Sequence, residues 1–168
     1  MTEDLSDLER LRAITRYDLD DPQLRRALGV ITAETSQRLP GSLTAVNILL
    51  DRAVLTMALH GAEHSMTAAV GGAPAEWSFC SRVVAEGRAQ VIDDVALDTG
   101  GDVDGRPLAA AGIHSYAGVP LATGDGHTIG THCALHPLRG HYDEGTIAVL
   151  EAAAERIRHE LDHALVGG

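Results

Sequence analysis

The chain contains no lysine, so all 13 of its basic residues are arginines, and 24 acidic residues outnumber them. The formal net charge is -11, and the arginines are scattered along the sequence rather than clustered. A phosphate backbone would therefore meet a repelling field. We expect no direct nucleic-acid partner.

Long apolar runs and cysteine patterns are also missing. No stretch approaches the about 20 apolar residues that cross a bilayer, and the acidic first residues lack the positive region of a secretion signal. Cys80 and Cys133 are the two cysteines, too few for a disulfide framework or a four-cysteine zinc site. We expect a cytoplasmic protein with no membrane partner, whose cysteines are reduced and buried.

Aromatic residues make up only 3% of the chain, so Leu, Val, Ile and Ala must fill most of the core. Two of the few aromatics, Trp77 and Phe79, sit almost side by side. The length of 168 residues fits one domain, because single domains commonly hold roughly 100 to 150 residues. We therefore treat residues 1–168 as a single unit.

Three segments have helical patterns. Leucines at three-residue steps predict a short amphipathic helix within residues 5–17. Asp21 and Pro22 supply a cap and first turn for a second helix that ends at Pro40. From Asp143 onward, apolar residues recur in steps of three and four, as in a coiled-coil seam. That seam can pack on its own sheet or on a second subunit.

The segment after the second helix predicts a β-hairpin. Two extended apolar runs, residues 43–50 and 53–59, are separated by Asp51 and Arg52 as a tight turn. Apolar residues occupy both alternating faces of the first run, which an open sheet with one wet face would not require. We therefore expect both faces of the sheet to be covered.

The middle of the chain is less regular. Residues 66–74 are small and Gly-rich, which indicates a loop, and residues 76–86 predict a short helix stopped by Gly87. A third strand is expected at residues 89–92. The acidic, Gly-containing residues 94–106 predict a mobile loop, of a kind that often lies over a site.

The last two strands are signalled by a turn. Residues 115–121 and 128–135 flank the triplet Gly124, Asp125 and Gly126, a strong hairpin pattern. A brief helix at residues 108–111 is expected before them.

Three blocks in the second half carry a family resemblance: SFCSRVVAEGRAQVIDD at residues 78–94, SYAGVPL at 115–121 and DGHTIGTHC at 125–133. Their order and spacing resemble the signature of the GAF domain family, over a core of about residues 22–165 preceded by the short N-terminal helix. The resemblance implies an α+β fold, similar to PAS domains. A central antiparallel sheet of five or six strands would carry the terminal helices on one face, with short helices and loops over a small-molecule pocket on the other.

The same resemblance implies roles for individual positions. Ser78, Phe79 and Cys80 would border the pocket, and Asp94 and Asp98 would stand where the family often has acidic residues, at the start of the roofing loop.

Two positions depart from the family pattern, since His132 replaces a residue that is commonly aliphatic and His136 one that is frequently acidic. No ligand or cofactor is therefore assigned by analogy. Aromatic rings supply area and a polar edge together, so aromatic residues and their neighbours are the best candidates for ligand contacts, with core packing as the alternative. The candidate ligand-binding residues are Trp77, Phe79, Cys80, Asp94, His114, Tyr116 and His132.

Several apparent catalytic or metal patterns have simpler interpretations. The run HELDH at residues 159–163 matches a zinc-protease pattern, but Leu161 belongs to the apolar seam, so we expect an exposed helix face. His132 and Cys133 are adjacent on a strand and must point to opposite faces, so with His136 they cannot share an ion unless the strand ends early. We expect His132 to be a hydrogen-bonded core or pocket residue rather than a metal ligand. The aspartates of residues 93–104 lack the spacing of a calcium loop. We predict no metal site.

Cys80 is either a packed thiol or a redox thiol. Its expected place well inside the helix of residues 76–86 favours packing. Bilin-binding relatives usually follow their anchoring cysteine with histidine, and Ser81 stands there instead. The free methionine sulfoxide reductases are GAF-like enzymes that depend on several cysteines, one of them in the loop before the fourth strand. No cysteine lies between Cys80 and Cys133.

The leading hypothesis is a non-catalytic GAF sensor that binds a small molecule and signals through its terminal helices, as a homodimer or to a partner kinase or regulator. The alternatives are a ligand-free dimerisation module and, third, a redox enzyme that uses Cys80. A cavity below roughly 300 Å³ would favour the ligand-free module.

Overall fold

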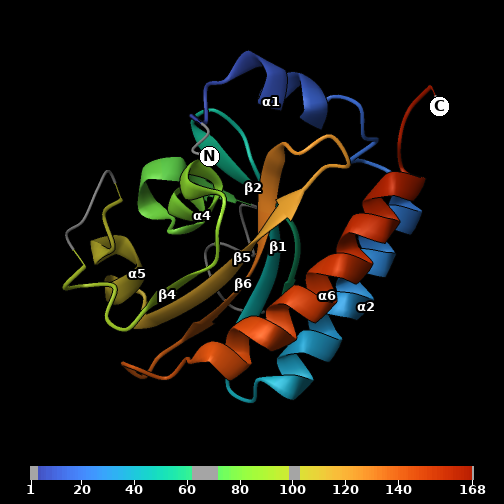
Figure 1. Ribbon diagram of the computed structural model, residues 1–168. Helices are drawn as coiled ribbons and strands as arrows, with labels where there is room; N and C mark the ends of the chain where they lie inside the picture. The colour runs from blue at the N-terminus through green and yellow to red at the C-terminus, as the bar shows by residue number, and fades with distance from the viewer. Residues whose placement is uncertain (1–3, 62–71, 99–102, 168) are drawn as a thin grey trace.

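A computed structural model describes residues 4–61, 72–98 and 103–167, and its centre is an antiparallel β-sheet (Figure 1). Within these residues the sheet has six strands in the order β3-β2-β1-β6-β5-β4, and every neighbouring pair is antiparallel. The predicted α+β fold is confirmed. The strands are β1 (Leu43–Leu49), β2 (Ala53–His60), β3 (Gly72–Pro74), β4 (Gln90–Ile92), β5 (Ser115–Ala122) and β6 (Thr128–His136).

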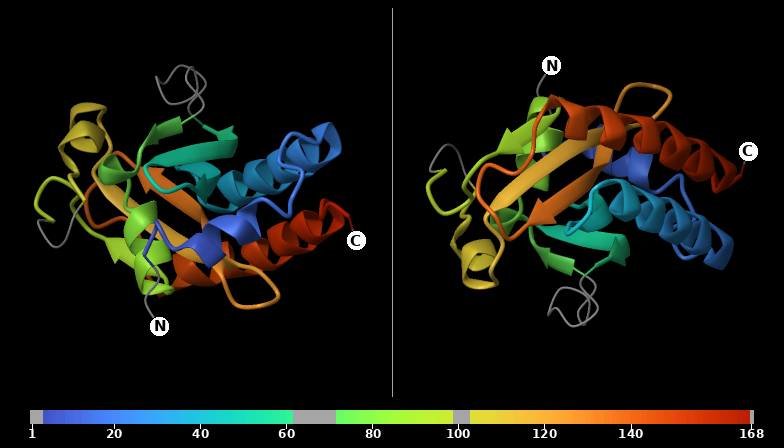
Figure 2. Two further views of the ribbon diagram at one scale, coloured as in Figure 1. Left: turned by 90° about the horizontal axis from the view of Figure 1, so that it is seen from above. Right: turned by 90° about the horizontal axis from the view of Figure 1, so that it is seen from below.

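Helices cover both faces of the sheet. The two long helices α2 and α6 lie side by side on one face, while α4 and α5 lie on the other and α1 crosses one end (Figures 1 and 2). Among the described residues, no helix combines the length and the apolar character needed to span a membrane. The helices are α1 (Leu8–Ile14), α2 (Pro22–Arg38), α4 (Cys80–Glu86), α5 (Arg106–Ala110) and α6 (Glu144–His163), with a 3₁₀ turn η1 (Ala75–Trp77) before α4.

The long helices begin where their caps predict. The Asp21 carboxylate accepts a hydrogen bond from the Gln23 N–H, 3.0 Å away, and Pro22 occupies the first turn of α2. Asp143 accepts from the Thr146 N–H at 3.1 Å, and the Thr146 hydroxyl accepts from the Asp143 N–H in return. This capping box ties the first turn of α6 to the loop that leaves β6.

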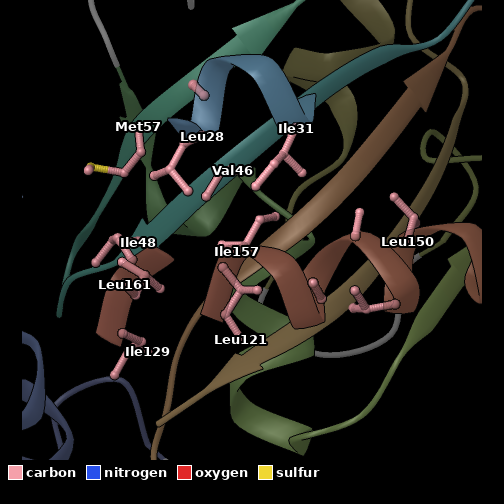
Figure 3. Close-up of a cluster of buried hydrophobic side chains, with 14 of the residues drawn as sticks. Leu28, Ile31, Val46, Ile48, Met57, Leu121, Ile129, Leu150, Ile157 and Leu161 are labelled. Atoms are coloured by element: carbon pink, nitrogen blue, oxygen red, sulfur yellow. The ribbon is translucent and has the colours of Figure 1, made fainter. Parts of the chain in front are cut away.

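The apolar seam of α6 packs on its own sheet and on α2 (Figure 3). Leu150, Ile157 and Leu161 are at most 3% exposed, whereas Leu165, beyond the helix end, is 45% exposed. The intramolecular alternative for the seam is therefore the one that the structure adopts.

Strand β1 separates two apolar layers, as its doubly apolar pattern predicts. Val46 and Ile48 join the cluster under α2 and α6, while Ala45 and Leu49 join a second cluster on the opposite face. All four side chains are buried, so neither face of the strand meets water.

The middle of the chain differs from the sequence prediction in two places. Gly72–Pro74 forms the edge strand β3 where a loop was expected, because it pairs with β2; residues 66–71 of that loop lie outside the described residues. The expected helix over residues 76–86 is divided into η1 and α4 by Ser78, whose backbone is extended. Cys80 is consequently the first residue of α4, not an interior one.

Other predictions for this region hold. Gly87 ends α4 in the left-handed conformation, with φ 65°, and β4 and α5 lie close to their expected positions. Residues 99–102 of the acidic loop lie outside the described residues, so the mobility of that loop stays a prediction.

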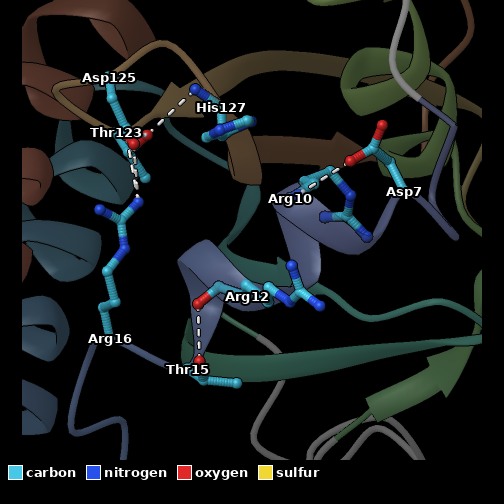
Figure 4. Close-up of polar contacts among 8 residues, drawn as sticks. All are labelled: Asp7, Arg10, Arg12, Thr15, Arg16, Thr123, Asp125 and His127. Carbon is cyan, nitrogen blue, oxygen red and sulfur yellow. Dashed lines mark hydrogen bonds and ion pairs between the residues drawn. The ribbon is translucent and has the colours of Figure 1, made fainter.

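The N-terminal helix is tied to the sheet by a buried arginine, Arg10; Figure 4 shows this residue on α1 beside Asp7, whose carboxylate accepts from the Arg10 N–H. Arg10 is fully buried, and its guanidinium donates to the Leu49 and Leu5 carbonyls, both at 2.7 Å. It also reaches the Thr128 carbonyl at 3.5 Å. Because buried carbonyls need donors, Arg10 joins α1 to the ends of β1 and β6.

We expect Arg10→Met to lower the free energy of unfolding by about 3 kcal/mol, because buried carbonyls lose a charged donor. Arg12→Met is the matched control, since Arg12 is an exposed arginine on the same helix. Urea unfolding of the two variants checks the prediction. Equal stability of the two would show that the buried guanidinium contributes nothing.

Candidate functional site

A cavity of about 390 Å³ lies between the sheet and the layer formed by η1, α4 and α5. Its volume exceeds roughly 300 Å³, and a cavity smaller than this would have favoured the ligand-free module. Its lining comes from β1, β2, β5 and β6 on the sheet side and from the short helices above. The lining residues are Gly41, Leu43, Ala45, Asn47, Val54, Thr56, Leu59, Gly61, Ala73, Trp77, Ser78, Phe79, Cys80, Leu108, Ala111, Ile113, Tyr116, Cys133, Leu135 and Pro137.

Two aromatic residues form one wall of this cavity. Phe79 is fully buried, and its ring centroid lies 5.8 Å from that of Tyr116 in a tilted arrangement. The Arg82 guanidinium covers the Phe79 ring at 5.0 Å from its centroid. Trp77 is 44% exposed, so it lines the cavity while remaining accessible to water.

The polar end of the cavity is organised around the Cys80 thiol. Its Sγ accepts hydrogen bonds from Thr131 Oγ1 at 3.0 Å, Tyr116 Oη at 3.2 Å and Asn47 Nδ2 at 3.5 Å. The donors come from three different strands. Gly118 makes the Tyr116 contact possible, because a Cβ at that position would collide with the phenol oxygen.

These donors, with the neighbouring Cys133 thiol, favour the thiolate form of Cys80. The hydrogen bond from Cys133 is the largest contribution, and together with those from Ser78, Thr131 and Tyr116 it outweighs burial and lowers the pKa of Cys80 to about 6. The same hydrogen bond, together with burial, raises the pKa of Cys133 well above its ordinary value. Within this buried pair, the negative charge therefore belongs on Cys80 and the proton on Cys133.

The cavity brings together four of the seven predicted ligand-binding residues: Trp77, Phe79, Cys80 and Tyr116. Asp94 and His114 do not line it. Asp94 accepts from the Ala96 N–H and from Arg139 Nε, and its nearer oxygen is 3.9 Å from His114 Nδ1.

Burial alone would raise the pKa of Asp94, but the bonds from the Ala96 N–H and Arg139 lower it. Asp98 likewise pairs with Arg82 at 3.0 Å. These two carboxylates pair with arginines on neighbouring segments, and they do not line the cavity.

The placement of His132 in the pocket is wrong. His132 lies on the helix face of β6, because Cys133 takes the cavity face and adjacent strand residues point to opposite sides. Its ring contacts Thr35 Oγ1 and the Ala45 carbonyl, each at 2.9 Å, and it is fully buried. Burial lowers the pKa of His132 to about 4, so the ring is neutral at physiological pH.

Sequence reasoning missed three residues of the polar end: Asn47, Thr131 and Cys133. Asn47 is 7% exposed, and while its Nδ2 faces the sulfurs, its Oδ1 has no hydrogen-bond partner among the described residues. An amide inside a largely apolar strand was the available signal, because a buried polar group needs a partner.

Four of the other histidines form two pairs rather than a metal cluster. His136 stacks on His141 with ring centroids 3.6 Å apart, and His159 meets His163 edge-on at 4.5 Å on the exposed side of α6. In the three described stretches of the chain, no group of three or more His, Cys, Asp or Glu side chains is arranged to hold a metal ion.

Comparison with known proteins places this architecture in a family. The family model described as "GAF domain" matches residues 23–161, nearly the whole chain. The chain belongs to the GAF domain family. No curated protein sequence matches it.

Solved structures share the GAF fold with this chain at low sequence identity. A putative GAF sensor protein from Burkholderia vietnamiensis is 17% identical with a TM-score of 0.66, covering 93% of this chain and 91% of its own. The GAF domain of Acinetobacter phosphoenolpyruvate-protein phosphotransferase is 14% identical with a TM-score of 0.67, covering 98% and 96%. A type II free methionine-R-sulfoxide reductase from Thermoplasma acidophilum is 15% identical with a TM-score of 0.69, covering 89% and 99%. The neighbours thus include both sensors and enzymes.

We expect the ultraviolet absorbance of the thiolate to titrate near pH 6 in the intact domain. Thr131→Val removes a donor to the sulfur and should raise the pKa of Cys80 by about one unit, since a hydrogen bond to a charged group contributes about 1.5 kcal/mol. Thr44→Val is the control, because Thr44 is a buried threonine on β1 whose hydroxyl faces α2 and donates to the Thr32 carbonyl. If the pKa of Cys80 is the same in both variants, Thr131 does not act as a donor that stabilises the thiolate.

His132 should make the domain unstable in acid. Its pKa falls from 6.5 to about 4 on folding, so the unfolded chain binds the proton more tightly. The free energy of unfolding should therefore drop as pH falls through this window, by about 3 kcal/mol from this group. Urea unfolding of His132→Asn should show a shallower pH slope between pH 6.5 and 4 than the wild type, and an unchanged slope would contradict the assignment to His132.

Proposed function

We propose that this GAF domain is a non-catalytic sensor that binds a small molecule in the cavity and signals through its terminal helices. The observation that carries the proposal is the cavity itself. It has about 390 Å³ of space, a mostly apolar lining and a polar end with an acceptor that has no partner among the described residues. Pockets of this size and character are typical small-molecule sites.

The contacts around the cavity supply a route to the termini. Leu49 belongs to the apolar cluster on the cavity side, and its carbonyl accepts from Arg10 on α1. The segment after α1 is in turn bonded to the end of α6, since the Val166 N–H donates to the Arg16 carbonyl and the Asp18 N–H to the Ala164 carbonyl, both at 2.8 Å. A shift of the end of β1 on ligand binding would therefore move both termini.

The receiver of the signal is, in this proposal, a second copy of the chain or a cytoplasmic kinase or regulator. The α6 seam is buried inside the monomer, so a homodimer must use other surfaces. Exposed apolar residues near the termini supply area for this: Leu8 is 66% exposed and Val166 is 63% exposed.

A redox enzyme is the second candidate, and the Cys80 and Cys133 pair favours it. Solved neighbours include free methionine-R-sulfoxide reductases from Staphylococcus aureus and Neisseria meningitidis. In such a reaction the Cys80 thiolate would take the sulfoxide oxygen as a sulfenic acid, with uptake of one proton and release of the thioether. The Cys133 thiol would then attack the sulfur of this sulfenic acid, which releases water and forms a disulfide. An external thiol would reduce that disulfide.

The sensor is preferred because an amino-acid substrate carries an ammonium and a carboxylate. None of the described residues that line the cavity is Asp, Glu, Lys, Arg or His. A buried zwitterion would therefore lack ionic partners there.

The two candidates separate in one assay. Purified protein with free methionine sulfoxide and a dithiol reductant should show no turnover above background if the domain is a sensor. Turnover in the wild type that disappears in Cys80→Ser would establish the enzyme instead.

For the sensor, we expect native mass spectrometry of the purified protein to reveal a retained or added small molecule across a panel of metabolites. Ala45→Phe should abolish binding by filling the cavity from β1, where Ala45 is buried against Cys133. Ala53→Phe, an exposed position on β2, is the control and should bind normally. Absence of any bound molecule across anionic, cationic and neutral compounds would refute the proposal.

A further inference from the structure

The inference concerns the chemical class of the molecule in the cavity, and it rests on the proposed function. We propose that the cavity selects an uncharged, largely apolar molecule that carries one N–H or O–H donor, which hydrogen-bonds to Asn47 Oδ1. The charge, the hydrogen bonds and the size of the site favour this class of molecule.

Charge excludes anionic ligands. No cationic side chain is among the described residues that line the cavity. The Arg82 guanidinium lies over the Phe79 ring and pairs with Asp98. The polar end is instead electron-rich, because the donors around Cys80 Sγ favour the thiolate. A carboxylate or phosphate placed there would meet a like charge without a counter-ion.

At the polar end of the cavity, hydrogen bonding favours a ligand that is the donor. The hydroxyls of Tyr116 and Thr131 donate to the Cys80 sulfur, so these two donors are not available to a ligand. Asn47 Nδ2 is committed to the same sulfur at 3.5 Å and to Cys133 at 3.7 Å.

The orientation of the Asn47 amide follows from these contacts, because its nitrogen must face the electron-rich sulfurs. The oxygen on the other edge of the amide is then an acceptor in a buried position, without a partner among the described residues. A buried acceptor left unsatisfied is costly, so a ligand that donates to it gains more than one that does not.

Size and lining favour a compact ring system. A cavity of about 390 Å³ lies at the lower end of the range for small-molecule pockets, roughly 300 to 1,000 Å³. The rings of Phe79 and Tyr116 and the aliphatic side chains Leu43, Leu108 and Leu135 supply apolar contact on several sides. One donor on a flat apolar body of one or two rings satisfies both the amide and the walls.

Three bicyclic probes test the proposal on the wild-type protein, by titration followed with amide nuclear magnetic resonance at a pH above the Cys80 titration. Indole has the N–H donor, indene has the same shape without it, and indole-2-carboxylate adds an anion. We expect indole to bind at least about tenfold more tightly than indene, a difference of the size of one buried hydrogen bond. We expect indole-2-carboxylate to leave the amide chemical shifts unchanged.

Asn47→Leu should remove the preference, so that indole and indene bind equally. Thr44→Val is the matched control, because it removes a polar group from the opposite face of the same strand. If Asn47→Leu does not fold, the comparison of the three probes on the wild type still decides the matter.

Equal binding of indole and indene by the wild type, binding of the carboxylate, or no binding of any probe would overturn the inference. A preference for indole that persists in a folded Asn47→Leu protein would also overturn it. The sensor proposal fails separately, when a wider panel that includes charged metabolites yields no ligand. An anion retained by the purified protein would leave the sensor intact and refute only the inference about its ligand.

Discussion

The alternation of side chains along the central strands is the constraint on which this molecule depends. Neighbours on β6 are sent to different environments: His132 bonds to α2 and to β1, while Cys133 faces the cavity. On β1, Val46 and Ile48 serve the helical layer and Ala45 and Asn47 the other. One face is filled by large aliphatic residues from α2 and α6, and the other is only partly filled by short helices. A slip of one residue in register would exchange the two faces.

The hollow face has an unusual distribution of polarity. Its walls are apolar, and its polar groups converge on one sulfur, since Asn47, Tyr116 and Thr131 all donate to Cys80. Such convergence stabilises a thiolate without any cationic side chain among the described lining residues. It also commits these three donors to the sulfur, while Asn47 Oδ1 is left as an acceptor without a partner among the described residues. Low polarity overall and an electron-rich end are therefore two results of the same arrangement.

Much of this architecture is visible in the sequence, because it is encoded locally. The caps at Asp21 and Asp143, the stop at Gly87 and the two hairpins follow from residues close together in the chain, and the order of three short blocks indicates the GAF family. The wall formed by Phe79 and Tyr116 was likewise predictable from those blocks.

The polar end was not predictable, because its members come from segments far apart and meet only in the fold. Asn47 and Thr131 lie 33 and 51 positions from Cys80, and neither belongs to a pattern that indicates a thiol. The position of Cys80 at the start of α4 depends on the extended backbone of Ser78, which composition alone does not reveal. His132 was predicted to be a pocket residue because it departs from the family pattern. The alternation of side chains along β6 instead assigns it to the helical layer.

The buried guanidinium of Arg10 has a consequence for where this domain begins. The family match starts at residue 23, beyond α1, yet the carbonyls of Leu49 and Thr128 accept from the guanidinium of residue 10. A fragment cut at the family boundary would lose that buried donor, and it would lose the strand bridge between Tyr17 and Leu165. The folding unit is thus longer than the homology unit, and excision by homology would remove the part that joins the two ends of the chain.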